Sequence, residues 1–317
     1  MIFLNKKMTP IGYYILNVIV LSSQFIYSQN LILTNTTINS EKINLKQSLL
    51  MADSEDNNYD PLRTEIDYTI LGSLSALYLG SGIGMHLYQQ KAWWSDQKVP
   101  FHFTNDWAYA RSIDKVGHFY GATLLAHAFS AGLEAANFST KDSYLYSGIA
   151  ALAFQMYVEI EDGFGPKWGF SPGDAAADFL GAAFSTSQYY FPYLKNFQMK
   201  ISYLPSQKFR NGETFSVIDD YEGQKYWLAF RMEELLPETA ANFWPDFLNL
   251  AVGYGVDKLD GVGGGDSEFY IGLDFDAEQI PLHGKFWQFI KNTLNYVHFP
   301  LPGIRISPDA AFLAFAF

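Results

Sequence analysis

Two alternating segments, LNLAVGYGV at residues 248–256 and EFYIGLDFD at residues 268–276, decide the fold class of the C-terminal part of the chain. In the first segment, every second residue is large and apolar: Leu248, Leu250, Val252, Tyr254 and Val256. Small or polar residues fill the positions between them. Because strand side chains alternate between two faces, this pattern predicts antiparallel strands with an apolar outer face. The same polarity suits a lipid-facing wall and an ordinary sheet covered on one side.

Further segments extend this prediction over residues 196–317. Residues 198–204 and 225–232 alternate in the same way, and the chain ends in AFLAFAF, with Phe317 last. That ending resembles the C-terminal strand of outer-membrane β-barrel proteins, which closes on an aromatic residue. The six or seven strands expected here are fewer than the roughly eight of a closed membrane barrel. We therefore expect an antiparallel sheet or a partial or small barrel, with helices completing its wall.

An amphipathic segment at residues 283–298 interrupts the strands and predicts an interfacial helix. The part before the strands, residues 63–195, is rich in small residues and has a helical pattern. Uncharged runs predict helices over residues 69–90, 116–133 and 143–158, and a fourth helix from about 171 to 190. The sequence thus predicts an α+β protein, with a helical bundle first and the β domain second.

The composition of these helices fits two environments. Glycine, alanine and serine allow close helix packing, as membrane bundles prefer, and a tightly packed soluble bundle would look similar. By length, only residues 69–90 favour a membrane.

The N-terminus has the parts of a secretory signal. Lys6 and Lys7 precede an apolar run at residues 11–21, and small residues lead to a cleavage site after Ser28. This run is shorter than the ~20 residues of a spanning helix, which favours a cleaved signal peptide at residues 1–28 over an anchor. Residues 29–62 are polar and predict a flexible lead-in.

Charge and composition exclude several classes of function. The 21 Lys and Arg residues against 33 Asp and Glu give a net charge of −12, which argues against a nucleic-acid partner. The absence of cysteine excludes a disulfide scaffold, a cysteine-ligated metal, a thiol nucleophile and a lipidated cysteine. Aromatic residues make up 17%, as do charged residues, a balance common at membrane surfaces. We expect membrane lipid and other envelope proteins as partners.

Polar residues of the helical part gather in three clusters. The first contains Asp114, Lys115 and His118, and the spacing of four places Asp114 and His118 on one helix face. The second cluster lies near the end of the third predicted helix and shares a face through spacings of four and three. Its members are Gln155, Glu159 and Asp162.

The third cluster opens the fourth predicted helix. Ser171 is a natural N-cap followed by Pro172, and Asp174 three positions later completes a capping-box pattern. Asp178 follows one turn later on the same face, and Gly181 permits close packing beneath it.

These clusters carry a family resemblance over about residues 110–190. The ordered motifs D-K-x-x-H-F, E-x-x-D and G-x-x-W-G-F-S-x-x-D-x-x-x-D-x-x-G-A resemble the YfiM-like family of predicted periplasmic lipoproteins of unknown function. A fainter similarity links the first and last motifs to VanZ-like membrane proteins. The matching positions are Asp114, Lys115, His118, Phe119, Glu159, Asp162, Trp168, Gly169, Ser171, Asp174, Asp178, Gly181 and Ala182.

The resemblance implies an envelope location but no reaction. This chain departs from the family because it has no cysteine for a lipid anchor and because residues 196–317 have no counterpart in the short family members. We therefore expect the β part to replace the lipid as the anchor. The expected location is the outer membrane or the periplasmic face of a Gram-negative envelope.

Two hypotheses describe the clusters. In the first, they form a site that binds a divalent metal or supplies a general acid and base. Its candidate residues are His118, Glu159, Asp162, Asp174 and Asp178. In the second, Lys115 pairs with Asp178 or Glu159, while Asp174 caps its helix and His118 donates to a carboxylate. The cluster would then be a satisfied polar network that locks an apolar bundle.

The second hypothesis is favoured, because perturbed polar clusters include structural ion pairs and because no motif of a named reaction supports the first. We thus expect a non-enzymatic structural or assembly component of the outer membrane. The alternative is a metal-dependent or acid/base hydrolase acting on envelope lipid or glycan. Among other residues, His127 is expected to be a satisfied core histidine, and Trp93 and Trp94 to belong to an interface belt or a packed loop.

Overall fold

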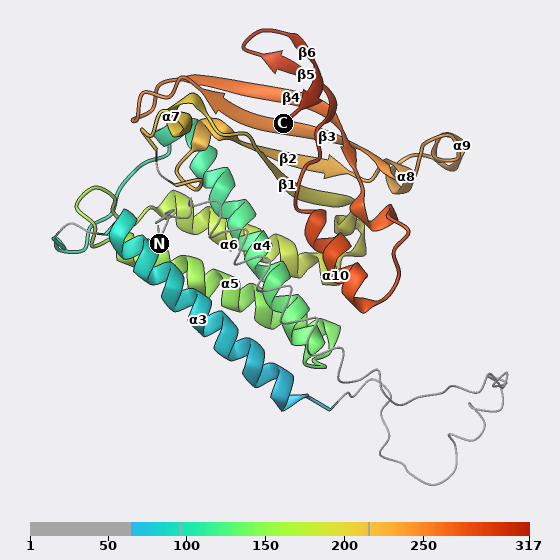
Figure 1. Cartoon of the computed structure of the whole chain (residues 1–317), viewed down its shortest axis with the longest axis horizontal. Helices are drawn as coiled ribbons and strands as arrows, with labels where there is room; N and C mark the ends of the chain where they lie inside the picture. The colour runs from blue at the N-terminus through green and yellow to red at the C-terminus, as the bar shows by residue number, and fades with distance from the viewer. Residues whose placement is uncertain (1–64, 95–96, 215) are drawn as a thin grey trace, which may run out of the picture. The chain divides into compact units, whose positions relative to one another are not determined.

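Helices occupy the first part of the chain and an antiparallel sheet the second in the computed structural model, which describes residues 65–94, 97–214 and 216–317 (Figure 1). The α+β fold class is therefore confirmed. The predicted signal peptide at residues 1–28 and the predicted lead-in at residues 29–62 both lie outside the described residues.

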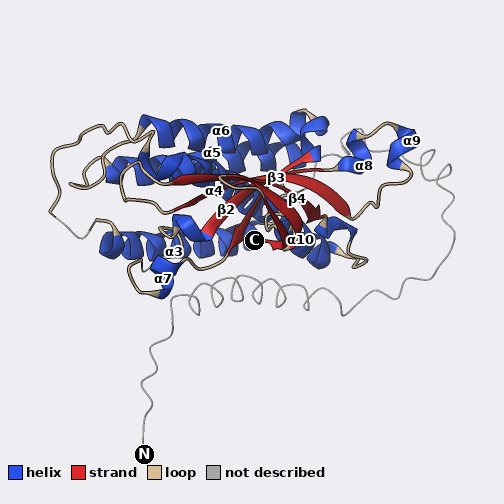
Figure 2. Cartoon of the chain, turned by 90° about the horizontal axis from the view of Figure 1, so that it is seen from above, coloured by secondary structure: helices blue, strands red, loops and turns tan. Residues whose placement is uncertain are grey.

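Four long helices follow the predicted runs closely. They are α3 Tyr68–Ala92, α4 Ile113–Ala135, α5 Thr140–Asp162 and α6 Pro172–Tyr190. Side-chain caps fix three of the starts, because Asp67, Ser139 and Ser171 accept backbone N–H bonds from the first turns of α3, α5 and α6. Helix α4 is central: α5 and α6 pack against one side of it and α3 lies on the other (Figure 2).

Small residues form the contacts between these helices. Helix α6 buries Gly181 against α4, where an added Cβ would clash with the backbone carbonyl of Phe119. Helix α5 buries Ser147 and Gly148 and exposes Ile149. This arrangement is typical of helices that approach closely through small residues, and it confirms the predicted packing role of Gly181.

The sheet has six strands in the order of the sequence, each antiparallel to the next. The strands are β1 Phe197–Tyr203, β2 Gln224–Phe230, β3 Leu248–Asp257, β4 Asp266–Phe275, β5 Leu301–Ser307 and β6 Ala311–Ala316. The short helices are α7 Gln207–Arg210, α8 Met232–Leu235, α9 Glu238–Ala241 and α10 Lys285–Leu294. Among the described residues, β1 and β6 do not pair, so the sheet is not closed into a barrel.

The strand register produces one apolar row across the outer face of the whole sheet. Its six members, one on each strand, are Met199, Leu228, Val252, Ile271, Ile304 and Phe312. The first end of the row is covered, since Met199 is 9% exposed, whereas Ile304 is 51% and Phe312 is 73% exposed. The neighbouring row on the inner face contains Ala229, Ala251, Gly272 and Gly303. The predicted alternation of large outer and small inner residues is therefore present along these two rows, although the inner face also contains the large side chains of Trp227 and Tyr270.

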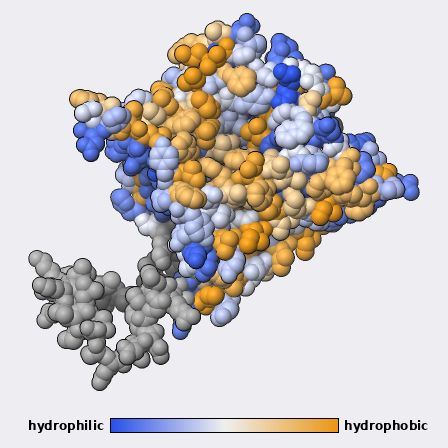
Figure 3. Space-filling view, turned by 180° about the vertical axis from the view of Figure 1, so that it is seen from behind, coloured by the Kyte–Doolittle hydropathy of each residue, from blue (hydrophilic) through white to orange (hydrophobic). Residues whose placement is uncertain are grey.

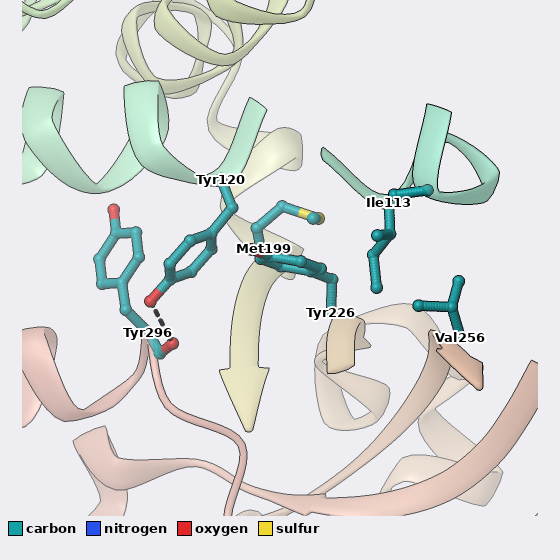
Figure 4. Close-up of a cluster of buried hydrophobic side chains, with 7 residues drawn as sticks. Ile113, Tyr120, Met199, Tyr226, Val256 and Tyr296 are labelled. Atoms are coloured by element: carbon teal, nitrogen blue, oxygen red, sulfur yellow. Dashed lines mark hydrogen bonds between the residues drawn. The ribbon is translucent and has the colours of Figure 1, made fainter. Parts of the chain in front are cut away.

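The core between helices and sheet lies where α4 covers this outer face. Tyr120 and Ile113 of α4 meet Met199, Tyr226 and Val256 of the sheet (Figure 4). The opposite, concave face of the sheet has its own core around fully buried Trp227. Both faces of β1 and β2 are thus buried, which fixes the position of the helices on the sheet.

The predicted interfacial helix at residues 283–298 is wrong in its C-terminal bound. Helix α10 ends at Leu294, and the next residues return to the sheet edge. There, Ile201 of β1 donates its N–H to the carbonyl of Tyr296 and accepts the N–H of His298. Backbone pairing with the open edge of β1 competes with continuation of the helix, because exposed edge groups need partners.

Candidate functional site

The predicted polar clusters meet where α4 begins, α5 ends and α6 begins. Helix α4 is preceded by three consecutive residues in the left-handed region, Ala110, Arg111 and Ser112, with φ of 46°, 57° and 63°. Such a run is costly for residues with side chains and persists only where the surroundings impose it. It turns the chain directly before Asp114 and Lys115, which are both buried.

Lys115 is the centre of a buried ion-pair cluster. Its Nζ atom lies 2.8 Å from Asp106 Oδ1, 2.9 Å from Asp114 Oδ2 and 2.9 Å from Asp174 Oδ1. The predicted pairing of Lys115 with Asp178 or Glu159 is therefore wrong. Lys115 lies in the first turn of α4 opposite the first turn of α6, so it meets Asp174 rather than the aspartate one turn further on.

That further aspartate, Asp178, holds His118. Oδ1 of Asp178 lies 3.1 Å from His118 Nδ1 and accepts a hydrogen bond of 2.7 Å from Gln155 Nε2. Asp178 is completely buried, whereas the His118 side chain is 25% exposed. The predicted contact of His118 with a carboxylate is present in the structure.

The start of α6 differs from the predicted capping box. Ser171 is the N-cap and accepts the N–H of Asp174, as predicted. The N–H of Ser171, however, donates to Glu159 Oε2 at 3.1 Å rather than to Asp174. Asp174 is paired with Lys115, and Glu159 at the end of α5 accepts the N–H of Ser171 in its place. Glu159 thereby joins α5 to α6.

Asp162 completes the cluster through a contact that the sequence analysis missed. Its Oδ1 accepts a hydrogen bond of 2.6 Å from the indole of buried Trp94, and Trp93 donates to Asp219 at 3.2 Å. These tryptophans hold carboxylates at the site, so they are packed residues and not a surface belt. Asp106 was missed too, because it lies in a loop with no periodic pattern.

Burial shifts the protonation of these groups. Burial raises the pKa of Glu159 to about 8 and the pKa of Asp162 and of Asp174 to about 6, and nearby positive charge opposes each shift. For His118, burial lowers the pKa, but the hydrogen bond and charge of Asp178, with the charges of Asp174 and Glu159, raise it to about 9 overall. The cluster therefore holds more negative groups than it can ionise together.

A cavity of about 910 Å³ opens beside this cluster. It lies between the ends of the helices and strands β1 and β2, and its wall includes His118, Glu159, Asp162 and Asp174. Apolar and aromatic side chains form much of the remaining wall, among them Leu124, Phe154, Ile201, Tyr221 and Tyr226. A large cavity with apolar walls and a few convergent polar groups is typical of a small-molecule site.

A second buried polar cluster lies on the concave face of the sheet and was not predicted. Lys200 Nζ is 2.6 Å from Asp274 Oδ2, and His298 Nδ1 is 2.9 Å from Asp274 Oδ1. All three residues are almost completely buried, and the His298 ring stacks on Trp227. Charged residues on the inner face of an alternating strand were the signal for this cluster. The positive charge of Lys200 is paired with the negative charge of Asp274 inside the curved sheet.

A separate cavity of about 260 Å³ adjoins that cluster. Its wall is mostly polar and includes Lys200, Arg231, Asn249 and His127. His127 lies 3.2 Å from the hydroxyl of Thr293 and is therefore a core histidine with a partner, in agreement with the prediction. The polar clusters of α4 and of the sheet thus adjoin two different cavities.

Comparison with known proteins identifies one family match. Residues 102–190, which contain α4, α5 and α6, match the model of a family described as "Predicted periplasmic lipoprotein (DUF2279)". No curated protein and no solved structure matches the chain. The match supports an exported, periplasmic protein of uncharacterised role. The 317 residues contain no cysteine to carry a lipid, which distinguishes this chain from the family description.

Within the described residues, one helix is long and apolar enough to cross a membrane. This is α3, with a mean hydropathy of 1.3 in its most apolar window. None of that window is buried in the protein, although length and composition alone do not place a helix in a bilayer.

Proposed function

We propose that the protein is a structural or assembly component of the outer membrane, which contacts lipid through its apolar surface. The outer row of the sheet carries this proposal. Its exposure rises from 9% at Met199 to 44% at Val252, 51% at Ile304 and 73% at Phe312. Exposed apolar strands over an inner face of small and polar residues are typical of sheets that face lipid.

Helices on another side of the molecule support the same environment. Helices α5 and α6 bury small and polar residues and expose large apolar ones, including Leu145, Ile149, Phe179 and Leu180. Hydrophobic side chains spread over much of the face seen in Figure 3. A single protein partner would have to cover both the helices and the sheet, whereas lipid covers several faces at once.

In this proposal the cluster around Lys115 and His118 is a structural lock. Its bonds join the start of α4, the end of α5 and the start of α6. Membrane lipid is the proposed partner, and other envelope proteins are candidates for assembly on the periplasmic side. The net charge of −12 argues against nucleic acid.

Membrane fractionation tests this proposal. The full chain is expressed in a Gram-negative host, and the membranes are separated by density. We expect the protein in the outer-membrane fraction, released only by detergent. The double substitution I304K and F312K places two charges on the outer row and should shift protein into the soluble periplasmic fraction. The control A310K adds charge at the exposed turn of the same hairpin. Soluble wild-type protein would overturn the proposal.

One observation favours a second candidate, hydrolysis of an envelope lipid or glycan. The cavity of about 910 Å³ brings an apolar wall to His118 beside Glu159 and Asp174, which offers a proton donor and acceptors next to space for an amphipathic molecule. Purified protein is incubated with phospholipid and lipopolysaccharide, and products are measured by mass spectrometry. Products lost in H118Q would support the hydrolase, and their absence in the wild type would leave the structural role.

A further inference from the structure

The two ring nitrogens of His118 have different surroundings. Nδ1 faces Asp178, whose carboxylate is fixed by Gln155 and by complete burial. Because a carboxylate accepts hydrogen bonds, this contact places a proton on Nδ1. The lone pair then resides on Nε2 whenever the ring is neutral. A histidine oriented by a carboxylate through one nitrogen is the usual arrangement of a metal ligand.

Two further carboxylates lie around the same ring at distances too long for hydrogen bonds. His118 Nε2 is 3.9 Å from Asp174 Oδ1, and the ring is 3.8 Å from Glu159 Oε1 through Nδ1. One ligand atom from each of the three residues lies within 4.8 Å of the others. Ligands that bind one ion at about 2.0–2.2 Å stand at most about 4.4 Å apart, so small side-chain rotations would bring these atoms to one ion.

The neighbouring group of three carboxylates already surrounds a cation. Asp106, Asp114 and Asp174 also lie close enough together for a cation, and the ammonium of Lys115 is between them at 2.8 to 2.9 Å. On the other side of Asp174, the group that faces Glu159 and Asp174 is His118 itself, at 3.8 and 3.9 Å. Lys115 therefore contacts its carboxylates at hydrogen-bond distance, whereas the distances from His118 to Glu159 and Asp174 are about 1 Å longer.

Unpartnered buried oxygen atoms are a second, independent observation. Oδ2 of Asp178 and Oδ1 of Asp114 are buried and have no hydrogen-bond partner among the described residues. Asp178 is fully buried and Asp114 is 6% exposed, and Asp114 also lines the large cavity. Buried carboxylate oxygens without donors are costly. Positive charge brought to this cluster would offset that cost.

We propose that His118, Glu159 and Asp174 bind one divalent transition-metal ion, with Asp178 and Gln155 positioning the histidine. One imidazole with two carboxylates suits zinc or manganese. Because all three residues line the large cavity, the open coordination positions of the ion would face it and accept water or an oxygen atom of a ligand. The site is separate from the apolar surface, so this inference does not depend on the proposed membrane role.

Metal binding to the detergent-purified full chain tests the inference. The protein is prepared without chelator, stripped with EDTA and reloaded with zinc or manganese, and bound metal is measured by mass spectrometry. We expect about one ion per chain in the wild type and none in H118Q or D174N. Replacement by cobalt should produce visible absorption bands that are also lost in H118Q. The control H127Q removes a histidine of the same helix that lies outside the cluster, and it should retain the ion.

A second variant keeps the test decisive if H118Q does not fold. D178N retains the ligands but removes the charge that orients His118, and it should weaken metal binding about 10- to 100-fold. Circular dichroism checks that each variant is folded. A wild type that takes up no ion at micromolar zinc or manganese overturns the inference, as does equal binding by wild type and D178N. Neither result would alter the membrane fractionation.

Discussion

The hydroxyl of Tyr120 donates a hydrogen bond to the backbone carbonyl of Tyr296, 2.9 Å away, and so connects the central helix to the segment that follows α10 (Figure 4). The two rings are also in contact, and both side chains are buried. The same carbonyl accepts the N–H of Ile201 at 3.0 Å. One acceptor therefore joins α4, β1 and the C-terminal part of the chain.

Substitution Y120F tests this connection. The ring packing is retained, but one hydrogen bond is lost, so we expect the free energy of unfolding to fall by about 0.5–1.5 kcal/mol. The lower end is expected because Ile201 still partly satisfies the carbonyl. Denaturant unfolding in detergent measures the change, with Y146F on the exposed face of α5 as the control. Equal losses in both variants would contradict a specific role for the Tyr120 hydroxyl.

Substitution G181A tests the close approach of α6 to α4. The added Cβ would clash with the carbonyl of Phe119 and lie 3.1 Å from the Cβ of Ala122. Backbone atoms cannot move aside without separating the helices, so we expect a loss of about 1–3 kcal/mol in unfolding free energy. The matched change G80A meets nothing within 4 Å and should be neutral or stabilise by up to ~1 kcal/mol. Similar stabilities for the two variants would argue against tight packing at Gly181.

Substitution K115M tests the buried ion-pair cluster. It leaves buried Asp114 and Asp174 without their cation, and we expect a loss of about 3–5 kcal/mol and a lower amount of folded protein in cells. Adding D114N and D174N should recover part of that loss. In contrast, K98M breaks a pair whose lysine side chain is 58% exposed and should cost no more than about 1 kcal/mol. A mild effect of K115M would mean that the cluster does not lock the helices.

His127 should make stability depend on pH. Burial lowers the pKa of His127 from 6.5 to about 4, and the neutral ring fits its contact with Thr293, whose hydroxyl already donates to Phe289. Below pH 6.5, His127 therefore binds a proton in the unfolded chain but stays neutral in the folded protein. Stability should fall as the pH drops from about 6.5 to 4, by roughly 3 kcal/mol at the lower end. Above pH 6.5 this group has no effect.

The variant H127Q isolates that contribution. Carboxylates titrate over part of the same range, so the informative quantity is the difference between the two stability curves. Unfolding free energies are measured at intervals from pH 7.5 to pH 4.5. The curve of H127Q should be flatter than that of the wild type, and parallel curves would show that His127 is protonated in the folded state.

Local patterns predicted much of the fold. The alternation at residues 248–256 depends only on which side chains are large, so the apolar row through Val252 and Ile271 could be inferred directly. Ser171 as the N-cap of α6 and Gly181 as a packing position could also be predicted locally. Helix capping and close helix approach depend on the residue types at a few neighbouring positions.

Pairings between distant residues could not be predicted in this way. The ion pair between Lys115 and Asp106 depends on a left-handed turn at residues 110–112, and no sequence pattern indicates this turn. Lys200 and Asp274 belong to strands that are not neighbours, and they meet because the sheet curves. Curvature is a property of the whole sheet, so neither strand alone contains the information.

The backbone pairing of Ile201 with Tyr296 and His298 sets an order of events during biosynthesis. Strand β1 is made early in the β part, but its free edge is covered by a segment close to the end of the chain. A nascent or partly translocated chain that stops before residue 296 would carry this edge uncovered and prone to pairing with other chains. Coverage of this edge therefore waits for residues 296–298, so the chain needs chaperone protection until that segment has been delivered.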